Sequence, residues 1–583
     1  MKRYYFLLLL SAGLKVSGTA QTDARDDSVM TETVLENLSA PSTVPDDSPL
    51  LDILFPETGT QTSIKIRSRI INRLQRSAGY HGKYIGSSLK SYQRVQAIYG
   101  DHFSCGVLLE KDAGEKRLND FMSGNLILSK IGPLERFILG DYFIESGQGV
   151  ALWRSYDISK GADIVLPVKR KGEGLKPYLS AGEAGFFRGV AAELRFAQYS
   201  TSLFLSQTSN AATIDSSGNI TNFYTAGYYR TEEEIRKRNN VFEKTFGILL
   251  QYRFPVENKI GLTFYRTLFS KSLWFDNGRR VRGARIETIS IDYTFSYSKI
   301  SFFGEWSASN RVVAGTTGIL IAPSDDLRLI SSFRNYPYKF FTPHGLGFGE
   351  RPDNERGFYI GVNMKLPAYL RLSSYYDIFS CPPGARFSSG GNDLLLQLQF
   401  LPVSKLDIAC RYHRKITYQP VLVLNEFGFW KDIDLPVKKD NLRLEINYEV
   451  LRTVRIRGRY ERVYMKINSG GSENGTILYY DIVYTPVQKL CLNLRTIIFR
   501  TDSYASGIYE YERDMDGVLT QPVLYGRGVR WYIFVKYSPF EPVQISLKYS
   551  DHIRDDVKKI GSGLDMIPVN HDDRLGVQID LKL

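Results

Sequence analysis

The sequence predicts an all-β protein, a large antiparallel transmembrane β-barrel of about 24–26 strands. Three observations lead to this prediction. Apolar and polar residues alternate with a period of two over much of the chain. Short turns alternate with long loops, and aromatic residues recur at the last outward position before the short turns. After the amino terminus, no apolar run is long enough to cross a bilayer as a helix.

The amino terminus has the features of an export signal. Lys2 and Arg3 precede the apolar stretch Tyr4–Leu10, and small residues follow at positions 18–20. The alternative, a membrane anchor, requires about twenty apolar residues, and this stretch is much shorter. We therefore expect residues 1–20 to be a signal peptide that is cleaved after Ala20.

The segment that follows is acidic. Residues 21–62 are rich in Asp, Glu, Ser, Thr and Pro, which is too polar a composition to form a core. They predict a disordered periplasmic linker that would reach a periplasmic protein partner. We expect the barrel to occupy residues 63–583.

The alternation is most regular in the second half of the chain. The last ten residues, RLGVQIDLKL, alternate up to Leu583, and similar rows occur over 246–254, 289–297 and 358–366. Such a row has one side in an apolar medium and the other in a polar one. A two-sheet sandwich would also alternate, but its domains usually end at roughly 200–250 residues. We therefore favour a barrel in which the last strand pairs with the first, because an unpaired strand edge in lipid is costly.

Short turns punctuate these rows. Examples are YSKI (297–300), LPVSKL (401–406) and YTPVQKL (484–490), and longer segments such as 552–573 separate them. Outer-membrane barrels have short turns on the periplasmic side, so we expect the carboxyl terminus to be periplasmic. Leu583 stands where such proteins usually end in Phe or Trp, the residue that the barrel assembly machinery reads. That machinery is an expected partner.

Residues 64–200 alternate less regularly and are richer in glycine. The most distinctive segments are listed here: YIGSSLKSYQRV (84–95), EKDAGEK (110–116), GDYFIESGQGVALWRSYDISKGAD (140–163) and KRKGEGLKPYLSAGEAGFFRGVA (169–191). Through these motifs most of 64–250 resembles an uncharacterised family of large outer-membrane barrels, common in Bacteroidetes, in which the barrel follows a helix-hairpin-helix segment. The resemblance implies a barrel. The helix-hairpin-helix segment is missing here, because only residues 46–61 stand in its place, so nucleic acid is left open as a partner.

Two glycine-rich segments, 140–153 and 169–178, have two interpretations. Either they fold inward and narrow the pore, since glycine permits close backbone approach, or their glycines mark kinks and bulges in the wall. Four basic residues in the second segment are candidate anion contacts of a gate, although a charge run on a loop is more often simply solvated: Lys169, Arg170, Lys171 and Lys176.

The inward-facing phase of the strands carries more basic than acidic residues. Between the apolar rows of residues 243–583 we assign thirteen basic and seven acidic positions to the lumen. An excess of positive charge inside a low-dielectric wall attracts anions. The lumen-lining basic candidates are Arg371, Arg411, Arg443, Arg455, Arg457, Arg459, Arg495 and Lys548. The ladder Arg455-Arg457-Arg459 either lines an anion path or pairs across strands with Glu445 and other neighbours.

Neither catalytic nor metal-binding motifs are evident. The six histidines lack metal-ligand spacing, and there is neither a G-x-S-x-G motif nor a Walker loop. The four cysteines are far apart, so we expect no essential disulfide. We expect no enzymatic activity, no cofactor and no metal.

The formal net charge of +13 favours an anionic partner. Our first hypothesis is an outer-membrane pore or gated conduit for an anionic solute or polymer, in contact with membrane lipid and lipopolysaccharide. The second is a non-enzymatic accessory component of an envelope machine for secretion, surface assembly or DNA uptake, which would bind its partner through residues 21–62. A rim-active hydrolase is the third.

Overall fold

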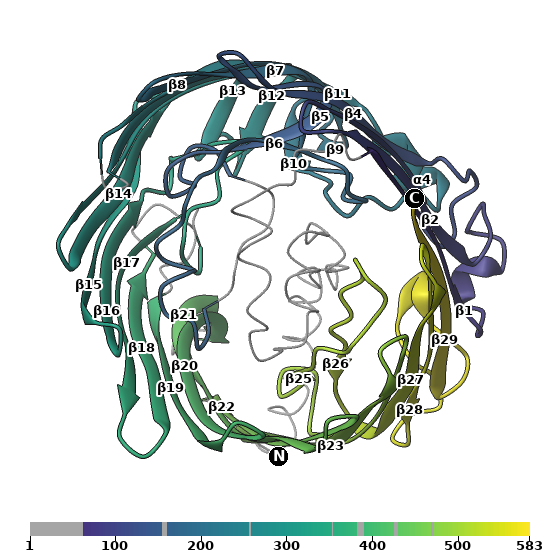
Figure 1. Ribbon diagram of the computed structural model, residues 1–583. Helices are drawn as coiled ribbons and strands as arrows, with labels where there is room; N and C mark the ends of the chain where they lie inside the picture. Colours follow the sequence, from purple (N-terminus) through teal and green to yellow (C-terminus); the bar gives the residue numbers. More distant parts are fainter. Residues whose placement is uncertain are drawn as a thin grey trace.

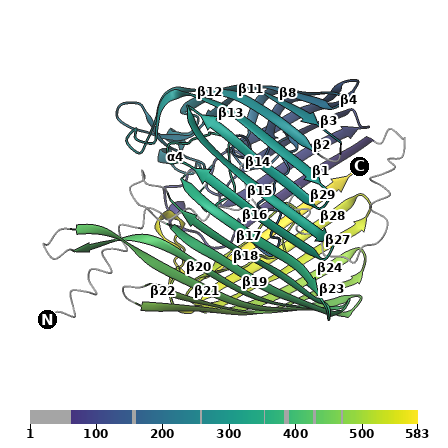
Figure 2. The same ribbon diagram turned by 90° about the vertical axis from the view of Figure 1, so that its left-hand side faces the viewer.

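A computed structural model describes residues 62–153, 160–255, 258–351, 354–381, 390–424, 430–467 and 471–583. The predicted signal peptide and all but the last residue of the predicted linker lie outside these ranges. Within them, twenty-four antiparallel strands form a closed barrel, which confirms the predicted fold class and the lower of the two predicted strand numbers. Figure 1 looks along the barrel, and Figure 2 shows the strands tilted against its axis.

The wall strands pair with their neighbours in chain order. The first half of the wall consists of β1 (Thr62–Arg73), β2 (Leu89–Tyr99), β3 (Phe103–Lys111), β4 (Phe121–Ile131), β5 (Leu134–Glu145), β7 (Phe187–Phe196), β8 (Tyr199–Asn210), β11 (Val241–Arg253), β12 (Lys259–Phe275), β13 (Val281–Tyr297), β14 (Ile300–Ser309) and β15 (Val312–Ser324).

The second half completes the circle. It consists of β16 (Leu327–Tyr336), β17 (Glu355–Leu366), β18 (Leu370–Ser380), β19 (Gly390–Val403), β20 (Leu406–Leu424), β21 (Trp430–Leu451), β22 (Val454–Ile467), β23 (Gly471–Val487), β24 (Leu490–Thr501), β27 (Arg527–Phe540), β28 (Val543–Arg554) and β29 (His571–Lys582).

The last strand pairs with the first, as the strict alternation of the final ten residues predicted. β29 runs antiparallel to β1, with Ile66 opposite Leu581. Ile64 and Leu583 exchange both backbone hydrogen bonds, at 2.7 and 2.8 Å. Closure therefore satisfies the backbone up to the final residue and leaves no sheet edge in lipid.

Alternate residues of each strand face opposite media. In β13, Ile289 and Ile291 are 49% and 50% exposed on the outer surface, whereas the intervening Ser290 is 2% exposed on the inner face. The six aromatic residues that precede short turns also have exposed side chains: Phe254, Tyr297, Phe400, Tyr448, Tyr484 and Tyr537. An outer band of apolar residues with aromatic rings at one end is typical of a barrel in a bilayer.

The two ends of the barrel differ. Turns such as 298–299, 404–405 and 452–453 contain two residues each, whereas the opposite end carries long connections that include 211–240 and 502–526. The first described residue, Thr62, and the carboxyl terminus both lie at the short-turn end, because β1 begins there and β29 ends there.

Helices are few and short. α4 (Glu232–Lys237) has a capping box between Thr231 and Glu234, and two 3-10 turns, η3 (Ala78–Tyr80) and η4 (Gly563–Asp565), lie in other long connections. No helix among the described residues is long and apolar enough to span a membrane.

Several long connections fold into the barrel, where Figure 1 shows β6 (Gly174–Pro177), β25 (Ile508–Tyr509) and β26 (Val523–Leu524) inside the ring of wall strands. The connection 211–240 contributes β9 (Ala212–Ile214) and β10 (Ile220–Phe223) at the long-loop end. Hydrophobic clusters form where these segments meet the wall. The core of the protein is therefore a layer between the wall and the segments folded against it.

Candidate functional site

The candidate site is the lumen, and three segments of the long-loop end occupy parts of it. They are the insert 146–186, of which 154–159 lie outside the described residues, the insert 337–351, and a strap formed by residues 502–526. We call these the first insert, the second insert and the strap.

The first insert is clamped to the wall through a buried carboxylate. Both oxygens of Glu305 on β14 are used: the backbone N–H groups of Gln148, Val150 and Ala151 donate to them at 2.7, 3.0 and 2.8 Å. Gly147 has a φ of +53°, and a Cβ there would lie 2.7 Å from the Glu305 carboxylate. The turn needs glycine for its backbone conformation and for this close approach.

Apolar packing holds the rest of the first insert. Ala151 and Leu152 are completely buried against wall residues such as Ile138 and Tyr142. Ile164 and Val168 pack against Phe303 and other residues further along the wall. Where the first insert covers it, the inner face of the wall therefore combines apolar patches with single buried polar residues such as Glu305 and Thr263, which bond to the insert.

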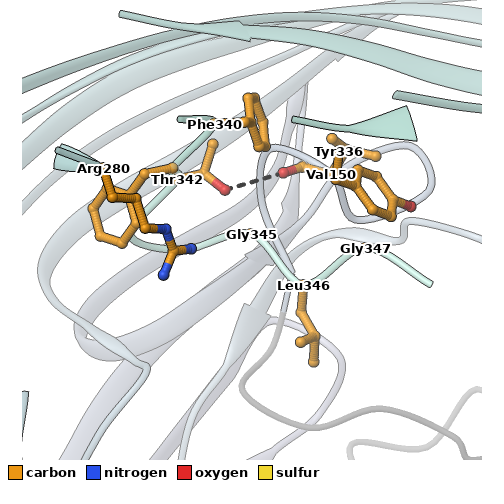
Figure 3. A pocket seen from close by; sticks show the side chains of 9 residues that line it. Val150, Arg280, Tyr336, Phe340, Thr342, Gly345, Leu346 and Gly347 are labelled. Carbon is orange, nitrogen blue, oxygen red and sulfur yellow. Dashed lines mark hydrogen bonds between the residues drawn. The ribbon is translucent and has the colours of Figure 1, made fainter. Parts of the chain in front are cut away.

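The second insert packs on the first. The N–H of Trp153 donates to the carbonyl of His344 at 2.8 Å, and His344 Nε2 lies 2.7 Å from the Glu243 carboxylate of β11. A cavity of about 230 Å³ lies between Val150 and residues 336–347. Figure 3 shows Arg280 beside this cavity and the hydrogen bond from the Thr342 hydroxyl to the Val150 carbonyl.

A buried ion-pair network anchors the two inserts to β17–β19. Lys160 of the first insert contacts Glu350 of the second at 2.5 Å and Asp377 of β18 at 2.6 Å. Arg334 on β16 is fully buried and pairs with Asp377 at 2.8 Å and with Glu355. Breaking such a pair leaves an uncompensated buried charge, which costs about 3–5 kcal/mol. The inserts are therefore firmly attached to the wall.

The strap is attached by apolar packing of Ile508, Met515 and Leu524 against the wall and by a row of carboxylates. Residues 510–516 read EYERDMD, with an acidic residue at every second position. Glu510 pairs with Arg495 at 3.1 Å and with Arg459, and Glu512 pairs with Arg530 and with Lys548 at 3.0 Å.

The end of the row continues this pattern. Asp514 also reaches Lys548, at 2.6 Å, and Asp516 pairs with Lys536 at 2.9 Å. The strap thus crosses the inner face of the wall from β22 to β28 and covers basic side chains with acidic ones.

Burial and ion pairing shift the pKa values of the strap carboxylates in opposite directions. Burial raises the pKa of Glu512, but Arg530 and Lys548 outweigh burial, and the net shift is downward. The same balance, with Lys536 as the main cation, lowers the pKa of Asp516. For Glu510 burial prevails over Arg459 and Arg495, and its pKa is raised. Docking of the strap therefore favours the ionised forms of Glu512 and Asp516.

The structure places the eight predicted lumen residues in three environments. Arg459, Arg495 and Lys548 pair with the strap, and Arg459 and Arg495 pair as well with Glu445 and Asp481 of the wall. The remaining contacts stay within the wall: Arg443 pairs with Glu461 at 2.7 Å, Arg411 donates to Gln397 at 2.7 Å, and Arg457 donates to Asn447 at 2.6 Å. The side chains of Arg371 and Arg455 make no hydrogen bond or ion pair with the described part of the chain.

The four basic residues of the first insert do not form one anion-binding group. Arg170 is buried, stacks 5.1 Å from the Trp153 ring and donates to the Leu346 carbonyl, and Lys169 donates to Ser301 at 2.8 Å. Lys176 pairs with Glu173, and Lys171 is exposed. Arg170, expected in an anion contact or on a solvated loop, instead joins the two inserts, because its segment folds inward.

Sequence reasoning missed the strap. Its carboxylates lie outside the apolar rows, so they were not counted among the lumen charges. The signal that could have revealed them is the four acidic residues at a two-residue spacing within one long loop. Arg530, which pairs with Glu512, was also absent from the predicted lumen residues.

No protein-family model and no curated relative matches the chain. Solved structures with similarity to it include the siderophore receptor PirA of Acinetobacter baumannii, at 9% identity over 90% of this chain and 81% of that one, with a TM-score of 0.43. A mutant of the ferric enterobactin receptor PfeA of Pseudomonas aeruginosa has 8% identity over 90% and 82% of the two chains and a TM-score of 0.45. OmpT, an outer membrane protein of Vibrio cholerae, matches at 10% identity over 59% of this chain and 98% of its own, with a TM-score of 0.27.

The chain's own strand pairing and surface decide the fold. A closed antiparallel barrel with an apolar outer band, a partly charged interior, and short turns at one end has the features of an integral outer-membrane barrel. The resemblance of most of residues 64–250 to an uncharacterised family of large outer-membrane barrels stays a prediction.

Proposed function

We propose that the protein is a gated conduit of the outer membrane for an anionic solute or polymer, and that the strap is its gate. The observation that carries the proposal is that carboxylates of the strap, and not of the wall, neutralise three basic residues of the lumen. Among the described residues, Arg530, Lys536 and Lys548 have acidic partners only on the strap and none on the wall. Withdrawal of the strap would leave these cations facing the lumen.

Exposed cations in a low-dielectric wall raise the local concentration of anions. The strap carboxylates occupy the positions that a carboxylate or phosphate of the cargo would take. A competing polyanion would therefore favour the withdrawn state, since it gains contacts only when the strap has left. The inserts, which are attached to other wall strands by their own apolar packing and buried ion pairs, would stay in place and narrow the remaining passage.

The orientation belongs to the same proposal. The short-turn end, with Thr62 and the carboxyl terminus, would face the periplasm, and the strap would approach from outside. Lipopolysaccharide would surround the long-loop end. We propose no enzymatic role.

The test is the conductance of the refolded barrel in a planar bilayer. Replacing residues 503–525 by a short Gly/Ser connector is expected to raise the single-channel conductance and make it anion-selective. The control replaces residues 556–569, another long connection, and should leave the conductance unchanged. Equal conductance with and without the strap would contradict the gate.

The accessory-component hypothesis makes a different prediction. The described chain begins at the short-turn end, so residues 21–61 join the barrel there. If they bind a periplasmic protein, their deletion will abolish recovery of that protein in a pull-down and leave the conductance of the barrel unchanged.

A further inference from the structure

A second group of carboxylates lies at the long-loop end, away from the strap. Five acidic residues from the β3–β4 region and from the first insert converge there: Glu110, Asp112, Glu115, Asp120 and Glu183. One oxygen each of Glu110, Asp112 and Glu115 lie within 4.8 Å of one another, and so do one oxygen each of Glu115, Asp120 and Glu183. Glu115 belongs to both groups, so the five side chains form one cluster.

Several of these oxygens lack partners although they are buried. Glu110 is 1% exposed, and neither of its carboxylate oxygens accepts a hydrogen bond. The ammonium of Lys90 lies 3.5 Å from Oε1, while Oε2 has no partner among the described residues. A buried Glu183 oxygen also accepts no hydrogen bond. Buried polar atoms are almost always satisfied, so unsatisfied carboxylate oxygens that point into one cluster indicate a ligand.

The local cations do not balance the cluster. Lys90 pairs with Asp112 at 2.7 Å, and Arg238 pairs with Asp120 at 3.0 Å. Lys111 donates to the carbonyls of Ser87, Leu89 and Asp112 and not to a carboxylate. Five acidic and three basic side chains leave two negative charges, which one divalent cation would neutralise.

We infer that this cluster binds one divalent cation of the calcium type. Its donors are oxygen atoms alone, without histidine nitrogen or cysteine sulfur, which suits a hard cation and disfavours zinc or copper. Calcium accepts six to eight oxygen ligands in flexible geometry, whereas magnesium demands a regular octahedron. Carboxylates that come from separate loops fit the flexible coordination of calcium more readily than the regular octahedron of magnesium. The sequence predicted no metal, because these residues share no motif spacing.

The cation would join three connections of the long-loop end. Glu110 lies at the end of β3, the β3–β4 connection contributes Asp112, Glu115 and Asp120, and Glu183 belongs to the first insert. Glu115 accepts a hydrogen bond from the Tyr229 N–H at 2.9 Å, which extends the group to the connection between β8 and β11. The role of the ion would be to hold these connections together, independently of whether the strap is a gate.

Isothermal titration of calcium chloride into barrel refolded from inclusion bodies tests the inference. Refolding without lipopolysaccharide removes a calcium-binding contaminant, and prior EDTA treatment empties the site. We expect one calcium ion per chain, at least tenfold weaker binding of magnesium, and at least tenfold weaker binding of calcium to the Glu183→Gln variant. Glu233→Gln removes an exposed carboxylate of α4 at the same end and should bind calcium as the wild type does.

Two results would overturn the inference: no calcium binding by the wild type, or equal binding by Glu183→Gln and the wild type. Heat-modifiable migration in SDS gels shows whether each variant has folded. If Glu183→Gln does not fold, the folded wild type with and without calcium tests the inference. Bound calcium should raise its melting temperature and slow its proteolysis within residues 178–186. An unchanged melting temperature and an unchanged cleavage rate would then refute the site.

Discussion

The strap offers the most direct mutational test of the gate. Glu512 has a completely buried side chain, and its carboxylate accepts hydrogen bonds from Arg530 at 2.9 Å and from Lys548 at 3.0 Å. In the Glu512→Gln variant the charge is lost and both cations stay buried. Removing one partner of a buried ion pair costs about 3–5 kcal/mol. Lys548 would still pair with Asp514 in the variant, so we use the lower end of this range, about 3 kcal/mol, as the cost.

This cost falls on strap docking and not on the barrel, because the strap can leave while β27 and β28 remain paired to their neighbours. At about 1.4 kcal/mol per tenfold change, the undocked population rises roughly 100-fold. Hydrogen exchange measured by mass spectrometry should show amides of 508–524 exchanging faster by that factor, with β27 and β28 unchanged.

The matched control is Glu541→Gln, which removes an exposed carboxylate in the turn between β27 and β28. It should exchange as the wild type does. The reasoning is refuted if strap exchange in Glu512→Gln equals that of the control. It is also refuted if strap and wall accelerate together, since the strap would then be an inseparable part of the barrel.

Three further predictions follow from other contacts. Gly147→Ala should raise the protease sensitivity of the first insert, because its Cβ would lie 2.7 Å from Glu305 at a φ of +53°; an unchanged digestion pattern would contradict this. The pKa values of Glu512 and Asp516 are lowered in the docked strap, so their contribution to docking is present above their ordinary values near 4 and is lost as pH falls through the lowered values. Because the raised pKa of Glu510 acts in the opposite direction, the measurement uses the Glu510→Gln variant, in which strap exchange, corrected for intrinsic rates, should stay constant from about pH 7 to 5 and rise only in stronger acid. Deletion of residues 574–583 should prevent folding, seen as loss of heat-modifiable migration, because β1 would lose its partner.

The architecture could be read from the sequence wherever the two faces of a strand meet different media. In β13 the apolar row from Ile289 to Tyr297 faces outward, and the period of two is clear. In β5, Ile138 is buried beneath the first insert while the adjacent Leu139 is 53% exposed on the outer surface. Both faces are apolar there, and the alternation disappears. This explains why the first third of the chain was harder to assign.

The candidate site was less accessible to sequence reasoning, because its partners are remote in the chain. Cross-strand pairing of Arg459 with Glu445 followed from strand register, and the structure contains that ion pair. The second partner of Arg459 is Glu510, which lies in a long loop, and the residue pattern of the sequence does not predict the path of that loop. Arg170 illustrates the same limit: the fold of the insert, and not the charge of the segment, decides that its guanidinium meets a carbonyl and a tryptophan ring.

Ion selectivity, measured as the reversal potential of the refolded barrel in a salt gradient across a planar bilayer, tests the central claim most directly. The barrel in which a Gly/Ser connector replaces 503–525 should be anion-selective, and its selectivity should fall when Arg530, Lys536 and Lys548 are all changed to Gln. The wild type should conduct little until a soluble polyanion is added. The account would be contradicted if the barrel without the strap were closed or cation-selective. It would also be contradicted if the three substitutions left the selectivity of that barrel unchanged.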